Sequence, residues 1–309
     1  PKRGIPAPWI TGKEDALMQE PAARNGTHLA PDMIARYWED GFLFPIDVLS
    51  RDEAQTYRTQ LELVERDWLD GDLPLPLNTY KRVNAQLVMP FVHEIATKPQ
   101  VLDVIEGVLG PDILIYSAEF FIKNAQSDQY VSMHQDLTYW GMGTTSEMVT
   151  AWIALSPATR ASGCMDFVKG SHKSEILPHT DTFSEKNLLS RGQEIAVDVA
   201  ETDKTAIELM PGQMSLHHGL TIHGSGPNVS DDRRIAVVVR YLTPKVAQNM
   251  ADQDFAMLAR GIDRVGKFIH YTAPQTLFES RAIDLYDEIR QSRAKAMMAG
   301  AKAQKGIYA

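Results

Sequence analysis

Two side chains near the middle of the sequence could together bind a metal ion. His134 and Asp136 are separated by one residue, in the segment Val-Ser-Met-His-Gln-Asp-Leu at residues 131–137. On a β-strand, side chains two residues apart leave from the same face, so this imidazole and this carboxylate can converge on one ion. Taken alone the pattern is a weak indication, because a histidine and an aspartate at this spacing occur by chance in many chains.

A third candidate ligand, His223, lies in the segment Leu-His-His-Gly-Leu-Thr-Ile-His-Gly-Ser-Gly-Pro-Asn at residues 216–228. Contributed by a second strand, it would complete a set of two nitrogens and one oxygen with three coordination positions open, which suits the oxygen chemistry of iron(II). Zinc is the competing metal, but with such ligands it normally keeps one open position for water. His217 is six residues before His223, so on an unbroken strand both side chains would leave from the same face. We interpret His217 as a core or neighbouring histidine rather than a ligand.

The elements that must position these residues change in character along the chain. Apolar residues at helical spacing predict a helix over residues 31–40, and a capping box predicts another that begins at Ser50. A third helix is predicted over 99–109, where Gly110 follows as a C-terminal cap. The first third of the sequence is therefore expected to be mainly helical.

After Pro111 the pattern becomes that of β-structure. Short apolar runs between turn-forming residues predict strands at 113–122, 149–155, 164–168, 205–209 and 235–242. Many short strands broken by turns favour a mainly β fold with flanking helices, in the form of a sandwich or barrel of the jelly-roll kind.

The chain has no internal repeat and no long Gly/Ser linker, which indicates one domain over residues 31–309 behind an irregular arm over 1–30. The long polar segment 174–198 is expected to be either a lid over the site or an insertion. A closing helix is predicted after Pro274, and its basic residues, among them Arg293, indicate a solvated surface helix.

Composition excludes several classes of partner. A formal net charge of -9 repels phosphate backbones, so no nucleic acid partner is expected. No apolar run approaches the length of a membrane span, and the single cysteine, Cys164, excludes an intrachain disulfide. These absences predict a cytoplasmic protein with a small-molecule substrate and without a membrane partner; they say nothing about oligomeric state.

The distal motif carries a specific resemblance. The chain resembles the phytanoyl-CoA dioxygenase-like branch of the iron(II)/2-oxoglutarate oxygenases, which shows H-x-D at a strand end, then a distal H-G-S-G-x-N turn, then an arginine eleven residues after the distal histidine. Here the turn reads Gly-Ser-Gly-Pro-Asn-Val-Ser at 224–230, and 223 + 11 leads to Arg234. Ala-Trp-Ile-Ala-Leu at 151–155 and Lys-Gly-Ser-His-Lys at 169–173 also match, and the likeness runs from about residue 30 to about 245.

The resemblance implies a double-stranded β-helix core in which His134, Asp136 and His223 bind iron. It also implies that 2-oxoglutarate chelates the iron through its keto acid end and pairs with Arg234 through its far carboxylate. A planar guanidinium suits that role because it offers two parallel donors and stays charged. Strand alternation agrees with Arg234 over Arg233, since Arg234 would share a face with the small Ala236.

Four further residues near these motifs keep open interpretations. Lys123 and Asn124 precede the His134 segment; each would either contact the co-substrate or the substrate, or take an ordinary exposed position at a strand end. His172 would either border the site or cap a turn. His179 has no partner visible in the sequence, and a satisfied core or surface position is the simpler interpretation.

The function that the resemblance implies is a dioxygenase that consumes iron-bound 2-oxoglutarate and O2 to hydroxylate a small organic substrate, with release of succinate and CO2. Because Asp136 is present, where halogenating relatives lack the carboxylate, hydroxylation is expected rather than halogenation. Two alternatives stay open: a zinc-dependent hydrolase or isomerase in the same cage, and a non-catalytic barrel that binds a small molecule. The sequence does not indicate which substrate is used.

Overall fold

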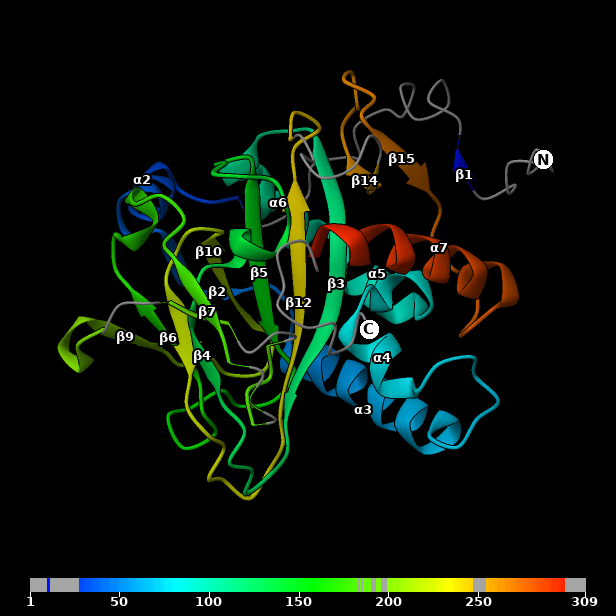
Figure 1. The fold of residues 1–309 in the computed structure, drawn as a ribbon, viewed down its shortest axis with the longest axis horizontal. Helices are drawn as coiled ribbons and strands as arrows, with labels where there is room; N and C mark the ends of the chain where they lie inside the picture. Colours follow the sequence, from blue (N-terminus) through cyan, green and yellow to red (C-terminus); the bar gives the residue numbers. More distant parts are fainter. Residues whose placement is uncertain are drawn as a thin grey trace.

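Two antiparallel sheets form the centre of the computed structural model, which describes residues 10–11, 28–182, 184, 186–189, 193–195, 199–246 and 254–297 (Figure 1). The larger sheet has the order β14-β3-β12-β5-β10-β2. Its strands, in that order, are Met257–Arg260, Ile113–Lys123, Arg234–Leu242, Met148–Ala154, Gln213–His218 and Phe42–Asp47.

The smaller sheet has the order β4-β11-β6-β9. Its strands are Val131–His134, His223–Ser225, Met165–Val168 and Lys204–Ile207. A third sheet joins β1 (Ile10–Thr11), β15 (Phe268–Tyr271) and β13 (Asp254–Phe255), and β7 (His179–Asp181) pairs with β8 (Gln193–Ile195).

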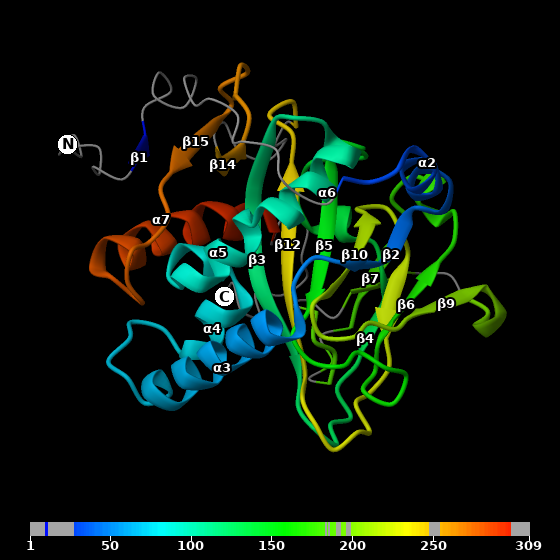
Figure 2. The ribbon, with the colours of Figure 1, turned by 180° about the vertical axis from the view of Figure 1, so that it is seen from behind.

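Six helices surround these sheets. They are α2 (Pro31–Asp40), α3 (Arg51–Trp68), α4 (Leu77–Arg82), α5 (Pro90–Thr97), α6 (Pro99–Leu109) and α7 (Ser280–Met297) within the described residues. Seen from both sides, α3, α4, α5 and α7 gather on the β3 side of the larger sheet, while the smaller sheet lies on the other side (Figures 1 and 2).

Local sequence explains where these helices begin and end. The hydroxyl of Ser50 accepts the backbone N–H of Glu53 at 3.1 Å, and the Glu53 carboxylate accepts the N–H of Ser50 at 2.8 Å, which completes the predicted capping box of α3. Gly41 ends α2 with a left-handed backbone (φ 85°) that favours glycine.

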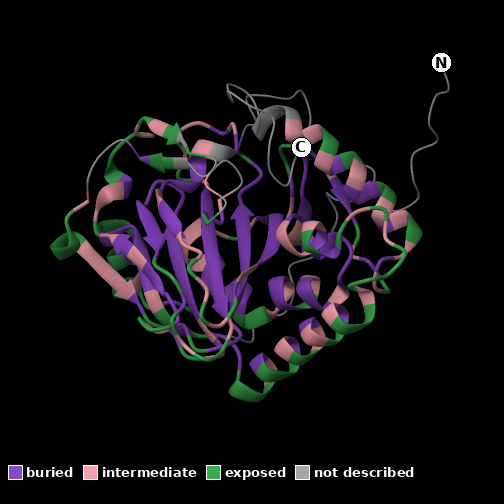
Figure 3. Ribbon diagram, turned by 60° about the horizontal axis from the view of Figure 1, so that its bottom comes forward, coloured by how far each residue is buried: buried purple, intermediate pink, exposed green. Residues whose placement is uncertain are grey.

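Strand β12 shows how the layers are held together. Its odd-numbered residues Ile235, Val237 and Val239 lie in the apolar cluster shared with the helices, whereas Ala236 and Val238 lie in the cluster between the two sheets. Because side chains alternate along a strand, one face of β12 meets helices and the other meets the smaller sheet. Both faces are therefore buried, and the central strands are the most buried part of the molecule (Figure 3).

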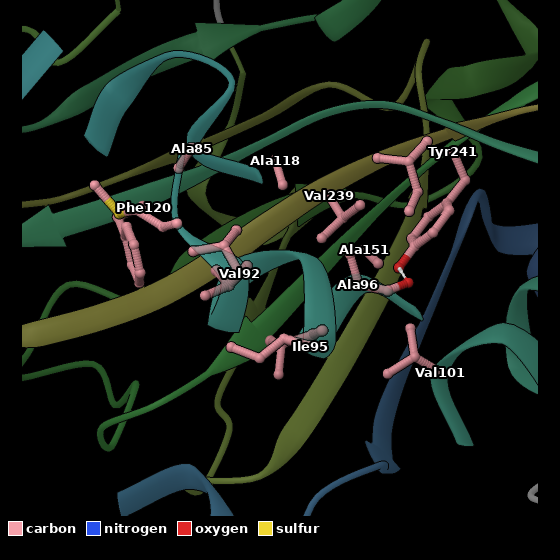
Figure 4. Packing of buried hydrophobic residues seen from close by; sticks show 14 of the residues in the cluster. Ala85, Val92, Ile95, Ala96, Val101, Ala118, Phe120, Ala151, Val239 and Tyr241 are labelled. Atoms are coloured by element: carbon pink, nitrogen blue, oxygen red, sulfur yellow. Dashed lines mark hydrogen bonds between the residues drawn. The ribbon is translucent and has the colours of Figure 1, made fainter. Parts of the chain in front are cut away.

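Helices α5 and α6 pack on the outer face of the larger sheet. Val92, Ile95 and Val101 from the helices meet Ala118, Phe120, Ala151 and Val239 from the strands (Figure 4). The hydroxyl of Tyr241 donates to the carbonyl of Ala96 at 2.7 Å, so the one polar group of this contact is satisfied. The packing fixes the strands whose opposite face carries the site.

The predicted fold class, mainly β of the jelly-roll kind with flanking helices, is confirmed. Each predicted strand is present within three residues at either end. The helices α4 and α5 and the strand β2 were not predicted. The division into an arm over 1–30 and one domain over 31–309 stays a prediction, because most of 1–30 and all of 298–309 lie outside the described residues.

The closing helix differs from the prediction of a solvated surface element. Arg293 is 4% exposed, and its guanidinium contacts Asp254 Oδ1 (3.1 Å), Asn84 Oδ1 and the Tyr116 carbonyl (both 3.0 Å). It also stacks on the Tyr116 ring at 3.7 Å. The side chain of Arg293 is buried because α7 places its guanidinium against the carboxylate of Asp254, which lies on the separate strand β13. None of the described helices combines the length and the apolar character needed to cross a membrane.

Candidate metal centre

Two of the three predicted ligands lie on neighbouring strands of the smaller sheet, and the third follows directly after one of those strands. His134 ends β4 and is paired directly with His223, the first residue of β11. Asp136 does not lie on the strand, as the sequence suggested, but opens a 3₁₀ helix over Asp136–Tyr139. Gln135 keeps an extended backbone (φ -119°, ψ 129°), so the carboxylate of Asp136 still leaves from the same side of the chain as the imidazole of His134.

The ligand atoms of the three residues face one another. Asp136 Oδ1 lies 3.5 Å from His134 Nε2 and 3.9 Å from His223 Nε2. One ligand atom from each of the three buried side chains lies within 4.8 Å of the others, a spacing that one ion could fill. Among the described residues this is the one cluster of three or more potential metal ligands of this kind.

Hydrogen bonds fix the orientation of both imidazoles. Nδ1 of His134 lies 2.9 Å from the carbonyl of Ser132, and Nδ1 of His223 lies 2.9 Å from the carbonyl of Thr221. A carbonyl only accepts, so each Nδ1 carries a proton, and Nε2 is the ring atom left to offer a lone pair to the centre. The donor set therefore fits a divalent metal ion.

The charges of the site agree with this assignment. Burial and the neighbouring imidazoles of His134 and His217 hold the pKa of His223 well below its usual range, so its ring is neutral. Burial raises the pKa of Asp136, but the guanidinium of Arg240 and the nearby imidazoles lower it more, so the net pKa lies well below that of an ordinary aspartate. Asp136 is thus a carboxylate at neutral pH.

A pocket of about 760 Å³, including its open mouth, adjoins the three ligands. Its apolar wall includes Phe121, Val131, Trp140, Trp152, Leu188 and Val238. Such a cavity, mainly apolar with a few convergent polar groups, is typical of small-molecule sites.

Arg234 lies in the same pocket and is buried. Its Nη1 donates to the carbonyl of Gly163 at 2.5 Å, and its guanidinium lies 5.3 Å from the centre of the Trp152 ring. Its Nε has no hydrogen-bond partner among the described residues. Burial lowers the pKa of Arg234 to about 10, so the group stays charged at neutral pH. Arg233, in contrast, forms an ion pair with Glu65 at 2.8 Å, away from the pocket.

Residues 37–236 match the family model of phytanoyl-CoA dioxygenase (PhyH). The chain belongs to the PhyH family. The resemblance that the motifs predicted is thereby confirmed. The relatives include a probable alpha-ketoglutarate-dependent hypophosphite dioxygenase of Stutzerimonas stutzeri, 27% identical over 51% of this chain and 55% of that one.

Individual relatives agree with the family match. A probable phytanoyl-CoA dioxygenase of Caenorhabditis elegans is 29% identical over 195 residues, which is 61% of each chain. The peroxisomal phytanoyl-CoA dioxygenases of cattle, rat and mouse are matched over 64% to 66% of their length. The aligned part of the chain therefore spans less than two thirds of the length of each of these curated relatives.

Solved structures extend the likeness over most of the chain. The apo form of ThoJ, a non-haem monooxygenase, is 32% identical with a TM-score of 0.78, over 87% of this chain and 98% of that one. A nickel complex of ThoJ is 28% identical with a TM-score of 0.73, over 87% of this chain and 99% of that one. CytC3 with Fe(II) and alpha-ketoglutarate, at 18% identity and a TM-score of 0.61 over 82% and 96% of the two chains, shares the fold.

The PhyH turn after His223 has a structural reason in this chain. The side-chain amide of Asn228 donates to three backbone carbonyls, those of Asn124 (2.9 Å), Asp232 (2.8 Å) and Lys123 (3.3 Å). A Cβ on Gly224 would come within 2.8 Å of the Val131 carbonyl, so β11 can approach β4 this closely only with glycine there.

Lys123 is buried beside Arg234, whereas Asn124 is an exposed residue. Nζ of Lys123 lies 2.6 Å from Oγ of Ser225 and also donates to the carbonyl of Gly226. Burial, followed by the charge of Arg234, lowers the pKa of Lys123 to about 6. Of the two residues left open by the sequence, Lys123 is thus the one that the structure brings to the Arg234 end of the pocket.

The other histidines take different places. His217 lines the pocket with Nε2 3.4 Å from Asp136 Oδ2, and neither ring nitrogen has a hydrogen bond among the described residues. His172 does not line the pocket; its Nε2 lies 3.0 Å from the Trp38 carbonyl. His179 accepts the N–H of Gln135 at 3.3 Å, so it contacts the residue that lies between two candidate ligands.

Three pocket residues of this PhyH chain were missed by the sequence analysis: Glu119, Thr150 and Arg240. Arg240 could have been predicted, because it lies an even number of residues after Arg234 on the same strand and therefore faces the same side of the sheet. Glu119 and Thr150 had none, because their proximity to the ligands depends on strand register, which the sequence does not display.

Proposed function

We propose that this chain is an iron(II)- and 2-oxoglutarate-dependent dioxygenase that hydroxylates a small organic substrate and releases succinate and CO2. The observation that carries the proposal is the pairing, in one buried pocket, of the His134, Asp136 and His223 ligand atoms with the charged side chain of Arg234. A three-ligand face leaves positions for a chelating co-substrate and for oxygen. Iron(II) bound with 2-oxoglutarate would supply the oxidising chemistry.

The protein's own groups would hold both partners. Nε2 of His134, Nε2 of His223 and Oδ1 of Asp136 would bind the metal on one side. Arg234 would receive the far carboxylate of 2-oxoglutarate, where a guanidinium can donate two parallel hydrogen bonds. The indole of Trp152, already stacked on that guanidinium, would border the carbon chain of the co-substrate.

Two neighbours would assist at the Arg234 end. The hydroxyl of Ser225, which lines the pocket and accepts a 2.6 Å hydrogen bond from the amine of Lys123, offers a donor beside Arg234. Arg82, whose guanidinium lies 5.1 Å from the Phe121 ring, adds positive charge to the pocket. The positive charges of Arg82 and Arg234 suit a co-substrate that carries two negative charges.

We propose that the segment 174–198 is a lid that would exclude water from the pocket. Leu188 and Leu189 from this segment line the pocket, and Arg82 donates to the carbonyl of Leu188. A dry cavity protects a reactive oxidant from side reactions. Residues 183, 185, 190–192 and 196–198 of the segment lie outside the described residues.

The remaining proposals concern context. We propose that the chain acts as one domain over 31–309 with an arm over 1–30, on a small molecule, and in the cytoplasm. The single cysteine supports the cytoplasmic location, and the net charge of -9 supports a small molecule rather than a nucleic acid as the partner. Cys164 is buried, and burial raises its pKa to about 11, so it behaves as a small core residue.

The test is a metal analysis combined with a succinate assay. Purified protein is loaded anaerobically with iron(II), given 2-oxoglutarate and air, and screened against acyl thioesters, amino acids and other small metabolites. Iron-dependent succinate release that Asp136→Ala abolishes is expected, and in the presence of chloride the product is hydroxylated rather than chlorinated. Stoichiometric zinc with hydrolysis and no oxygen uptake would instead establish the hydrolase alternative.

A further inference from the structure

Arg240 lies on the inner face of β12 but far from the Arg234 end of the pocket. The two arginines are six positions apart on an extended strand, or about 20 Å between Cα atoms. Arg240 pairs in register with Thr150 of β5 and is buried. It therefore serves a different part of the pocket from the one that would bind the co-substrate's far carboxylate.

The guanidinium of Arg240 lies between two carboxylates. Its Nη1 donates to Glu119 Oε1 at 2.6 Å, while its Nε lies 3.9 Å from Asp136 Oδ2. The ring centre of Trp140 lies 4.8 Å from its central carbon and restricts its movement. One cation is thus strongly bound to Glu119 and only loosely associated with Asp136.

The two oxygens of Asp136 face different partners. Oδ1 is directed to the imidazoles of His134 and His223, and Oδ2 accepts a 2.7 Å hydrogen bond from Thr150. A guanidinium that was free to move would form a two-pronged pair with the whole carboxylate, because that geometry is the stronger one. Such a pair would occupy Oδ1, the oxygen that faces the imidazoles.

We propose that Glu119 is a positioning residue for the metal centre: it holds Arg240 away from Oδ1 of Asp136 and so keeps that oxygen for the metal. The inference rests on the proposed function, because it takes the three residues to be metal ligands. Glu119 also offsets part of the charge of Arg240. Without Glu119, more of that buried positive charge beside Asp136 would oppose the binding of a divalent cation.

The experiment measures the affinity for Ni(II), a redox-inert probe, by calorimetric titration of the metal-free full chain. Glu119→Gln is expected to weaken Ni(II) binding by about 10- to 100-fold, the usual effect of losing a partner that orients metal ligands. The double variant E119Q/R240M removes the opposing charge as well, and its affinity is expected to return toward that of the wild type. Glu65→Gln, which removes a carboxylate that pairs with Arg233 outside the pocket, is the matched control and leaves the affinity unchanged.

Recovery in the double variant separates positioning from a merely structural role, because loss of packing would make the double variant bind worse than E119Q. Equal affinity of wild type and E119Q, or equally weak binding of E119Q and the double variant, would overturn the inference. Failure of the wild type to bind Ni(II) would overturn the proposed function itself. If E119Q does not fold, Glu119→Asp replaces it: the shorter side chain cannot reach Arg240 equally well, so weaker binding supports the inference and unchanged binding contradicts it.

Discussion

Oγ1 of Thr150 donates a 2.7 Å hydrogen bond to Oδ2 of Asp136, the carboxylate oxygen that faces away from the two imidazoles. This bond fixes the rotation of the carboxylate, so that Oδ1 is directed to His134 and His223. A metal ligand held in this way needs no reorganisation when the ion arrives.

Replacement of Thr150 by valine tests this bond with little change in volume. We expect Thr150→Val to weaken the affinity for iron(II) or Ni(II) by about tenfold, because the carboxylate loses a partner that orients it. The same titration on Thr56→Val, whose hydroxyl bonds only within α3, should give the wild-type affinity. Unchanged affinity in Thr150→Val would show that the carboxylate is oriented by other contacts.

The sequence was sufficient to pick out three candidate ligands that the structure brings together, but not the residues that orient them. His134 and His223 were found because each belongs to a short motif, and Arg234 because a fixed spacing leads to it. Thr150 and Glu119 were missed because they reach Asp136 and Arg240 through the register of β5 and β3 against β12, which involves residues far apart in the chain. Arg293 was wrongly expected on the surface because its partner Asp254 lies on a distant strand.

Arg234→Met tests the co-substrate site. Loss of one partner of a buried charge pair costs about 2–5 kcal/mol, so the KM for 2-oxoglutarate should rise by about 30-fold or more while metal affinity stays near that of the wild type. Arg233→Met is the matched control, since that side chain binds Glu65 outside the pocket. A KM that changes equally in both variants would argue against a distinct role for Arg234.

The low pKa of Lys123 predicts that the affinity for 2-oxoglutarate depends on pH. Its pKa of about 6 leaves the amine neutral at pH 7, and a dianion bound nearby would favour the protonated form and raise that pKa. Binding then takes up protons, so the affinity should fall as pH rises above 6. Anaerobic calorimetry in buffers with different heats of ionisation measures this uptake.

Lys123→Met provides the comparison for that measurement. The variant cannot take up a proton at this position, so its 2-oxoglutarate affinity should vary less between pH 6 and pH 9 than that of the wild type. The same pH dependence in both proteins would assign the proton uptake to another group.

The buried charge of Arg293 predicts a large effect on stability. Arg293→Met leaves the buried Asp254 without its cation, which typically costs about 3–5 kcal/mol of unfolding free energy. Arg290→Met removes an ion pair with Asp287 that is partly exposed, and should cost about 1 kcal/mol or less. Urea unfolding followed by circular dichroism compares the two, and equal stabilities would contradict the role assigned to Arg293.

A crystal structure with Ni(II) and 2-oxoglutarate, grown without iron, would show whether the three side chains and Arg234 together hold the metal and the co-substrate. We expect one ion bound by His134 Nε2, Asp136 Oδ1 and His223 Nε2, with the keto acid end of 2-oxoglutarate on the ion and its far carboxylate on Arg234. An ion bound elsewhere, or 2-oxoglutarate bound away from Arg234, would contradict this expectation.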